Sequence, residues 1–217
     1  MNPELPEILP LFPLPQVVFF PSSRLPLNVF EPRYLTLVGD VQAGDGWIAV
    51  PQLTGELGAD GEPAFHAVAG AGRITRVEPT SDGRFLIEIE GVTRVSLTEI
   101  EVDTPYRQAQ VEEYPELDAW LENPEGARSL RDLVRLARRV HVLDPGTGEV
   151  PDKRRGRREL VDGVAGKVLA DASERQAMLE APDYELRTRA LLRHLRVMDN
   201  TLQAVSRGGP PSNPEVN

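Results

Sequence analysis

The chain has 217 residues, of which 40% are hydrophobic and 27% are charged, and its formal net charge is −10. This composition predicts a globular protein with a sizeable core, in one large domain or two small ones, and the acidity argues against a general phosphate-binding surface. The absence of cysteine excludes disulfide bonds, thiolate metal sites and a cysteine nucleophile, and it fits a cytoplasmic location.

The most hydrophobic part of the chain, residues 9–34, is interrupted repeatedly by proline. Proline inside an apolar run disfavours a helix and restricts strands to short or edge pieces. We therefore expect short strands at residues 9–14, 17–20 and 25–30. A short helix is expected over residues 32–41, because Pro32 suits the first helical position, where its missing N–H costs nothing.

The middle of the chain predicts further strands. Residues 47–50 form a short apolar run that is typical of a buried strand, whereas residues 53–63 have the composition of a glycine-rich surface loop. Asp82-Gly83 is a good hairpin turn between alternating segments, and Gly91 interrupts the second alternation. With a last strand at residues 107–114, this series of short strands predicts a barrel or a sandwich.

After Pro115 the apolar residues repeat at spacings of three and four, which predicts amphipathic helices. The expected helices cover residues 116–123, 126–143 and 160–169. Another helix is expected to begin at Ser173, because Ser173 and Gln176 fit a capping box, and Asp183 is a plausible N-cap for the last helix. The tail, residues 206–217, has the composition of a disordered segment.

Three stretches carry a family resemblance. Their residues are 9–14 (LPLFPL), Pro21, 25–27 and 29–34 (VFEPRY), then Gly72, Ile74, 82–84, Ile87, Gly91 and Arg94, and finally 173–180 (SERQAMLE). The pattern resembles the LON substrate-binding domain, which is the N-terminal domain of Lon proteases and also occurs as a stand-alone bacterial protein. The resemblance implies an α+β fold. Its parts are a PUA-like β pseudobarrel over residues 1–115, a helical bundle over residues 116–205 and a disordered tail over residues 206–217.

The sequence shows no convincing catalytic or metal-binding motif. The nearest approach to a Walker A loop, residues 163–168 (GVAGKV), has the wrong spacing, lacks the hydroxyl residue and lies in a helical pattern. No G-x-S-x-G sequence occurs, and His66, His141 and His194 lie on separate elements without metal-ligand spacing. We therefore expect no enzymatic activity, cofactor or metal, since the ATPase and Ser–Lys protease regions of Lon are also missing. An unrecognised hydrolase is a further hypothesis.

Neither a signal peptide nor a membrane-spanning segment is expected. The first ten residues contain two glutamates and no basic residue, unlike a secretory signal. The sequence also lacks a run of about 18 apolar residues, which a helix needs to cross a bilayer.

The strongest local positive charge lies at residues 153–158 (KRRGRR). We interpret it as a solvated loop and helix start, and the alternative is contact with an acidic partner such as nucleic acid. No aromatic residues interleave this run, which disfavours binding of single-stranded RNA. The resemblance to PUA-like barrels, which often bind RNA, implies an RNA-binding module as the alternative function, and the net negative charge disfavours nucleic acid as a partner.

The resemblance implies a non-enzymatic protein-interaction module. Such a module would bind exposed apolar segments of a polypeptide or partner protein in a groove between the barrel and the helices. The candidate contact residues are Phe20, Leu25, Phe30, Trp47 and Phe65. Adjacent aromatic residues on a strand face opposite sides, so one of Phe19 and Phe20 is expected in the core and the other on the surface.

The sequence does not assign an oligomeric state.

The polar residues of the first stretch have two interpretations. They either lock the barrel to its short helix by hydrogen bonds, which we favour, or they form a binding site. These residues are Arg24, Glu31, Arg33 and Tyr34.

Overall fold

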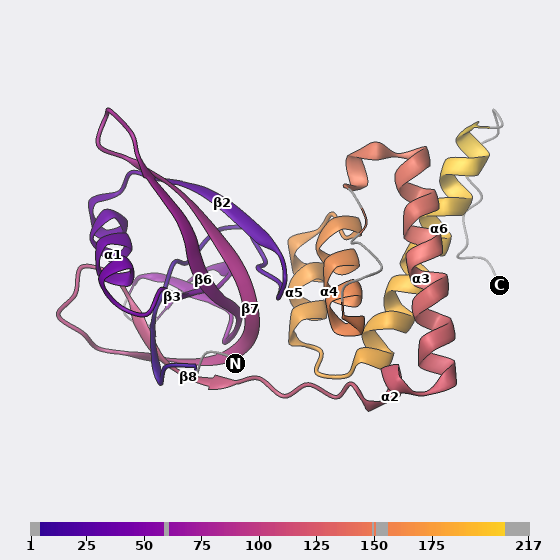
Figure 1. The fold of residues 1–217 in the computed structure, drawn as a ribbon, viewed down its shortest axis with the longest axis horizontal. Helices are drawn as coiled ribbons and strands as arrows, with labels where there is room; N and C mark the ends of the chain where they lie inside the picture. The colour runs from indigo at the N-terminus through magenta and orange to yellow at the C-terminus, as the bar shows by residue number, and fades with distance from the viewer. Residues whose placement is uncertain (1–4, 59–60, 149, 151–155, 207–217) are drawn as a thin grey trace. The chain divides into compact units, whose positions relative to one another are not determined.

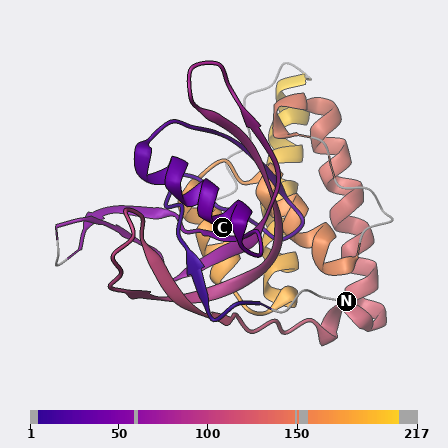
Figure 2. The same cartoon turned by 60° about the vertical axis from the view of Figure 1, so that its left-hand side comes forward.

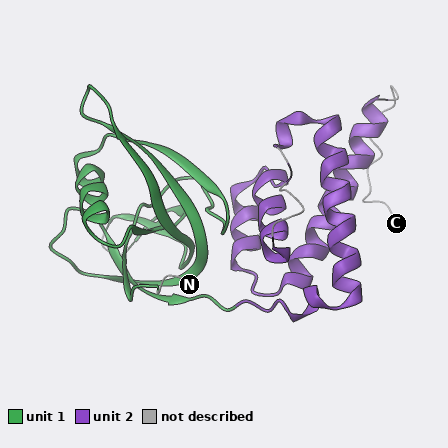
Figure 3. Cartoon of the chain, in the orientation of Figure 1, with its two compact units in different colours: residues 1–115 green, residues 116–217 purple. Residues whose placement is uncertain are grey.

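A computed structural model describes the chain except for residues 1–4, 59–60, 149, 151–155 and 207–217. The chain divides into two compact units, residues 1–115 and residues 116–217 (Figure 3). The first unit is rich in strands and the second consists of helices, so the expected mixed α+β fold is confirmed. No helix in the described part of the chain is long and apolar enough to cross a bilayer.

The first unit, which we call the β unit, contains one helix and a series of antiparallel strands (Figure 1). They are β1 (Ile8–Pro10), β2 (Arg24–Val29), α1 (Pro32–Ala43), β3 (Trp47–Val50), β4 (Leu53–Leu57), β5 (Pro63–Phe65), β6 (Val68–Pro79), β7 (Phe85–Ile100) and β8 (Gln108–Glu113).

The main sheet has the strand order β1-β8-β7-β6-β3, and β2 pairs with the first half of β7. The chain after β1 then returns to the opposite edge, because Leu11 forms a parallel bridge with Ala49 of β3 and Leu14 forms one with Gln52. The two edges of the sheet therefore meet, which closes the sheet in the manner of a small barrel.

Two close backbone approaches hold the segment before β2 against the long strands β6 and β7. A Cβ atom placed on Gly70 would lie 1.9 Å from the carbonyl oxygen of Phe19, and one on Gly91 would lie 2.3 Å from that of Phe20. Both positions therefore require glycine. Residues 17–20 cross the strands in this way without forming the strand that the sequence predicted.

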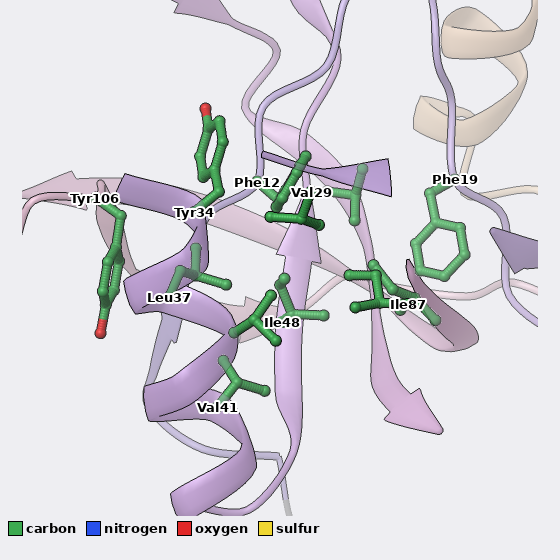
Figure 4. Packing of buried hydrophobic residues seen from close by; sticks show 12 residues of the cluster. Phe12, Phe19, Val29, Tyr34, Leu37, Val41, Ile48, Ile87 and Tyr106 are labelled. Atoms are coloured by element: carbon green, nitrogen blue, oxygen red, sulfur yellow. The ribbon is translucent and has the colours of Figure 1, made fainter. Parts of the chain in front are cut away.

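Within the described residues, buried apolar side chains of the β unit gather in clusters, of which we describe two. One cluster lies under α1 and includes Leu37, Val41 and Ile48 (Figure 4). The other includes Leu9, Trp47 and Val95. As expected, Pro32 occupies the first turn of α1 and the four residues of β3 are all buried.

Besides the strand at residues 17–20, two further predictions for the β unit were wrong. Residues 53–63 are not a loop throughout, because β4 and β5 pair as a hairpin that extends away from the rest of the unit (Figure 2). Gly91 does not end a strand, because β7 continues through it with only a register shift against β6 between Ala71 and Gly72. The expected turn at residues 80–83 is present, with Gly83 at φ +84°.

The second unit, which we call the helical unit, contains the remaining helices. They are α2 (Ala119–Glu122), α3 (Pro124–Leu143), the 3-10 helix η1 (Pro145–Thr147), α4 (Arg157–Val168), α5 (Ala172–Glu180) and α6 (Tyr184–Ser206). The apolar residues that predicted α3 face inward, among them Leu133 and Ala137. The predicted tail lies outside the described residues, except for Ser206.

Side-chain caps fix where these helices begin. Asn123 accepts a hydrogen bond from the Gly126 N–H at 2.8 Å at the start of α3, and Asp183 accepts from the Glu185 N–H at 2.7 Å at the start of α6, as predicted. The predicted capping box at Ser173 was wrong. Asp171 caps α5 instead, and Ser173 lies inside the first turn.

A buried polar network joins α4, α5 and α6. Arg187 donates to a carboxylate oxygen of Asp162 at 2.7 Å, and the hydroxyl of Tyr184 donates to the other oxygen at 2.9 Å. Arg187 also donates to the carbonyl oxygens of Leu179 and Ala181, near the end of α5. The side chains of Asp162 and Arg187 are 1% and 0% exposed, so this charge pair is fully enclosed.

Candidate functional site

The β unit contains a groove made of two adjoining pockets. One pocket has a volume of about 480 Å³ and a largely polar lining, and we call it the polar pocket. The other has a volume of about 320 Å³ and a more apolar lining, and we call it the apolar pocket. Both pockets are lined by Pro13, Arg33, Tyr34, Glu62 and Arg107. Because Tyr34 lies in the shared part, we call the whole feature the Tyr34 groove.

The groove collects residues that lie far apart in the sequence. The apolar pocket is formed by the chain after β1, the end of β2 and the start of the β4–β5 hairpin. The polar pocket is formed by the end of β7 and the connection to β8, residues 99–107. Pro32 begins α1 between these parts, so Arg33 and Tyr34 stand in the first turn of the helix at the centre of the groove.

Tyr34 is fixed by stacking on both sides. Its ring lies 4.2 Å from the ring of Phe12, at an interplanar angle of 25°. The guanidinium of Arg33 lies 4.6 Å from the Tyr34 ring centroid and forms an ion pair with Glu31 at 2.9 Å. The residue is only 8% exposed, and Figure 4 shows its hydroxyl directed away from Leu37 in the core. Burial raises the pKa of the Tyr34 hydroxyl, so the group stays protonated at neutral pH.

Arg107 holds the groove wall in place. Its guanidinium pairs with both carboxylate oxygens of Glu99, the Nη2–Oε2 distance being 2.5 Å, and donates to the carbonyl oxygen of Pro63 at 2.6 Å. It also lies 4.4 Å from the ring centroid of Phe65. Bidentate pairing with a carboxylate is specific in geometry, so Arg107 ties the β4–β5 hairpin to the start of β8.

The connection before β8 is anchored to α1 by Tyr106. The Tyr106 hydroxyl donates to a carboxylate oxygen of Asp40 at 2.7 Å. Burial, together with the hydrogen bond to this carboxylate, raises the pKa of Tyr106 to about 12. The polar pocket therefore has one wall held by α1 and another held by the hairpin.

The structure distributes the five predicted contact residues over different environments. Phe30 is 60% exposed and lines the apolar pocket. Phe65 is half-buried beneath Arg107, and Leu25 is half-buried against the core cluster under α1. Phe20 and Trp47 are 1% and 2% exposed, so neither side chain is available at the surface.

The reasons for these burials are local. Trp47 lies on β3, whose residues are all enclosed, and it packs in the second core cluster. The expectation that one of Phe19 and Phe20 is exposed assumed a strand, but the segment is not a strand and both side chains are buried. The sequence did not indicate Arg107 or Tyr106 as groove residues, because their partners Pro63 and Asp40 lie 44 and 66 positions away.

The side chains of Arg24, Glu31, Arg33 and Tyr34 form no hydrogen bond between the barrel and α1 within the described residues, so the interpretation that we favoured was wrong on this point. Arg33 and Glu31 pair with each other at the surface, and Tyr34 packs between Arg33 and Phe12, which is a structural role. Arg33 and Tyr34 also line both pockets of the groove. Arg24 makes only a long, exposed ion pair with Glu88 at 3.7 Å.

Two kinds of catalytic or cofactor site can be checked in the described part of the chain. Among the described residues, no group of three or more His, Asp or Glu side chains is placed to hold a metal ion. The Walker-like residues 163–168 form the last turns of α4, so they cannot wrap around a phosphate as a loop does.

The arginines at the start of α4 are engaged by carboxylates. Arg157 pairs with Glu122 at 2.9 Å, and Arg158 pairs with Glu116 and Asp118. Residues 153–155 of the basic run lie outside the described residues. Because these two guanidinium groups are partly neutralised, this part of the run offers little free charge to a phosphate backbone.

The chain matches the family model of the ATP-dependent protease La (LON) substrate-binding domain over residues 8–197. It is 27% identical over 194 residues to Lon protease 2 of Myxococcus xanthus, covering 87% of this chain and 23% of that protein. It is 30% identical over 197 residues to Lon protease 2 of Syntrophobacter fumaroxidans, covering 88% and 24%. The chain thus spans about a quarter of the length of these relatives.

Two solved structures share the fold. A Lon N-terminal domain protein from Xanthomonas campestris superposes with a TM-score of 0.59 at 24% identity, covering 86% of this chain and 97% of that one. The N-terminal domain of the Mycobacterium avium complex Lon protease superposes with a TM-score of 0.62 at 17% identity, covering 87% and 98%.

Proposed function

Because this chain belongs to the family of LON substrate-binding domains, we propose that it binds exposed apolar segments of other polypeptides without catalysing a reaction, and that the Tyr34 groove is the contact site. The family is named for substrate binding, and the relatives are named as proteases, so a polypeptide is the ligand class that fits best. The lack of cysteine supports a reducing compartment, and we propose the cytoplasm.

The observation that carries this proposal is the exposed aromatic side chain at the apolar pocket. Phe30 keeps 60% of its surface exposed although it follows directly on the buried Val29. The pocket beside it is lined by further apolar side chains, among them Leu14, Leu27 and Leu53. An exposed aromatic group next to an apolar hollow is a typical docking point for an apolar side chain of a partner.

The fixed walls of the groove also support binding of a flexible ligand. Stacking and ion pairing engage Tyr34, Arg33 and Arg107 with other residues of the β unit, without a ligand. A groove that is already ordered loses little conformational entropy on binding, so the ligand alone bears that loss.

The test is a titration of the protein against a fluorescently labelled, chemically unfolded polypeptide, followed by anisotropy. Phe30→Ser should weaken binding about tenfold, because burying a phenylalanine side chain contributes about 1.5–3 kcal/mol. Val142→Ser is the matched control, because Val142 is 76% exposed on α3, outside the groove.

Circular dichroism establishes that both variants keep their fold. The proposal fails if the unaltered protein does not bind the polypeptide. It also fails if Phe30→Ser and Val142→Ser bind equally well.

A further inference from the structure

The Tyr34 side chain is stacked and buried, and its hydroxyl is a polar group in the part of the groove that both pockets share. The residue is 92% enclosed, which follows from its 8% exposure, and it lines both pockets. Among the described residues, this hydroxyl has no hydrogen-bond partner. A tyrosine hydroxyl can donate one hydrogen bond and accept others, and the main chain of a peptide offers both N–H and C=O groups. The hydroxyl is therefore suited to a peptide backbone that passes between the pockets.

The polar pocket has more negative than positive groups. Its charged lining residues are Glu62, Glu99, Glu101, Arg33 and Arg107. Both guanidinium groups are already paired with carboxylates: Arg107 pairs with Glu99, and Arg33 pairs with Glu31. The carboxylate of Glu101 is exposed and has no ion pair within the described part of the chain. This pocket therefore favours a cationic side chain. The net charge of −10 also attracts cationic ligands at long range.

The two pockets adjoin, and this sets the spacing of the side chains that can fill them together. In an extended chain, side chains two residues apart point to the same side and lie about 7 Å apart. Side chains one residue apart point to opposite sides. An extended segment that lies along the groove can therefore place side chains two positions apart in the two adjoining pockets, with the backbone of the residue between them over the shared lining residues.

We infer that the Tyr34 groove selects extended segments in which an apolar residue and a lysine or arginine lie two positions apart. The apolar side chain occupies the pocket beside Phe30, the cationic side chain lies against Glu101, and the Tyr34 hydroxyl bonds to the main chain between them. This inference rests on the proposed function, because it specifies which apolar segments the same groove binds.

The test uses nine-residue peptides with one leucine anchor, labelled with a fluorophore and titrated with the full chain. One peptide has lysine two positions from the leucine, on either side. Its isomer has the same composition, with lysine at the adjacent positions. Two further peptides have alanine or glutamate in place of lysine at the two-position spacing. Because the isomers have equal charge, a difference between them cannot come from long-range attraction alone.

We expect the two-position lysine peptide to bind about three- to tenfold tighter than its isomer, and the glutamate peptide to bind most weakly. Glu101→Gln should remove the preference between the isomers, so that the two bind with equal affinity. Glu112→Gln is the matched control, because Glu112 is an exposed carboxylate on β8 outside the groove, and it should keep the preference. Tyr34→Phe should weaken all four peptides by a similar factor of about 2 to 12, since it removes one hydrogen bond.

Three outcomes separate the inference from the proposed function. Equal affinity of the two isomers overturns the inference while the binding of both supports the proposed function. A preference that survives Glu101→Gln also overturns it, because the cationic pocket would then lie elsewhere. Failure of every peptide and of the unfolded polypeptide to bind overturns both.

Discussion

The stability of the helical unit depends on the enclosed ion pair between Asp162 and Arg187. Asp162→Asn keeps the shape of the side chain and removes its charge. Arg187 then stays fully buried as a cation that has lost its carboxylate partner Asp162 but keeps its hydrogen bonds to the Leu179 and Ala181 carbonyl oxygens. The helical unit should therefore lose much of its free energy of unfolding.

The magnitude follows from the burial. Removing one partner of a buried ion pair typically costs about 3–5 kcal/mol, because an uncompensated charge is left in the interior. A domain of this size has a total free energy of unfolding of about 5–15 kcal/mol. The triple variant Asp162→Leu, Arg187→Met, Tyr184→Phe removes both charges and the hydroxyl that bonds to Asp162. It should be less destabilised than Asp162→Asn alone, because no charge stays buried.

Urea unfolding followed by circular dichroism at 222 nm measures these changes, because all the described helices except α1 belong to the helical unit. The reasoning is refuted if Asp162→Asn costs less than about 1 kcal/mol, the value of an exposed pair. It is equally refuted if the triple variant is less stable than the single one.

Three further predictions concern other parts of the fold. Gly70→Ala should destabilise the β unit by about 1–3 kcal/mol or more, because the new Cβ meets the Phe19 carbonyl oxygen. Gly39→Ala, with nothing within 4 Å on α1, should stabilise it by about 0.5–1 kcal/mol. Urea titrations followed by the fluorescence of Trp47, which is buried in the β unit, measure both changes. The pKa of Tyr106 is about 12 in the folded protein, above the ordinary value of about 10, so its contribution is complete below pH 10 and is lost between pH 10 and pH 12. As the pH rises over that range, the unfolding midpoint of Tyr106→Phe should fall less steeply than that of the unaltered protein. Parallel slopes would contradict the raised pKa of Tyr106. Asn123→Ala should cost the helical unit about 1 kcal/mol by removing the cap of α3, and no change in its thermal midpoint would show that the cap contributes nothing.

The elements that the sequence predicted well are those with a local physical cause. Pro32 suits the first turn of a helix wherever it occurs, and Asp82-Gly83 favours a tight turn without help from the rest of the chain. The three- and four-residue spacing of α3 likewise reflects only which face of that helix is buried.

The elements that the sequence missed depend on distant partners. The β4–β5 hairpin has a polar, glycine-rich sequence that is typical of a loop. Its strands form only because the two segments pair with each other. Gly91 weakens a strand by itself, but here it admits the backbone of Phe20 across β7. The cap of α5 was misplaced because Asp171 and Ser173 are both good caps, and only the hydrogen bonds distinguish them.

The candidate site shows the same division. Hydrophobicity suggested Phe30 and Trp47 equally, but Trp47 lies on the fully buried β3, whereas Phe30 follows the end of β2 and stays exposed next to the buried Val29. The position of Tyr34 at the groove could be suspected from the first stretch of the family resemblance, which ends at this residue. The partnership of Arg107 with Pro63 could not, because it requires the hairpin to be placed first.

The closure of the sheet by its first strand has a consequence for synthesis on the ribosome. Ile8 pairs with Gln110, about a hundred residues later, and residues 11–14 cover the other edge at β3. The nascent chain therefore has to expose its most apolar stretch until β8 leaves the exit tunnel, several seconds later at about 5–20 residues per second. The frequent prolines of that stretch act as gatekeepers during this interval, since they hinder pairing with other nascent chains.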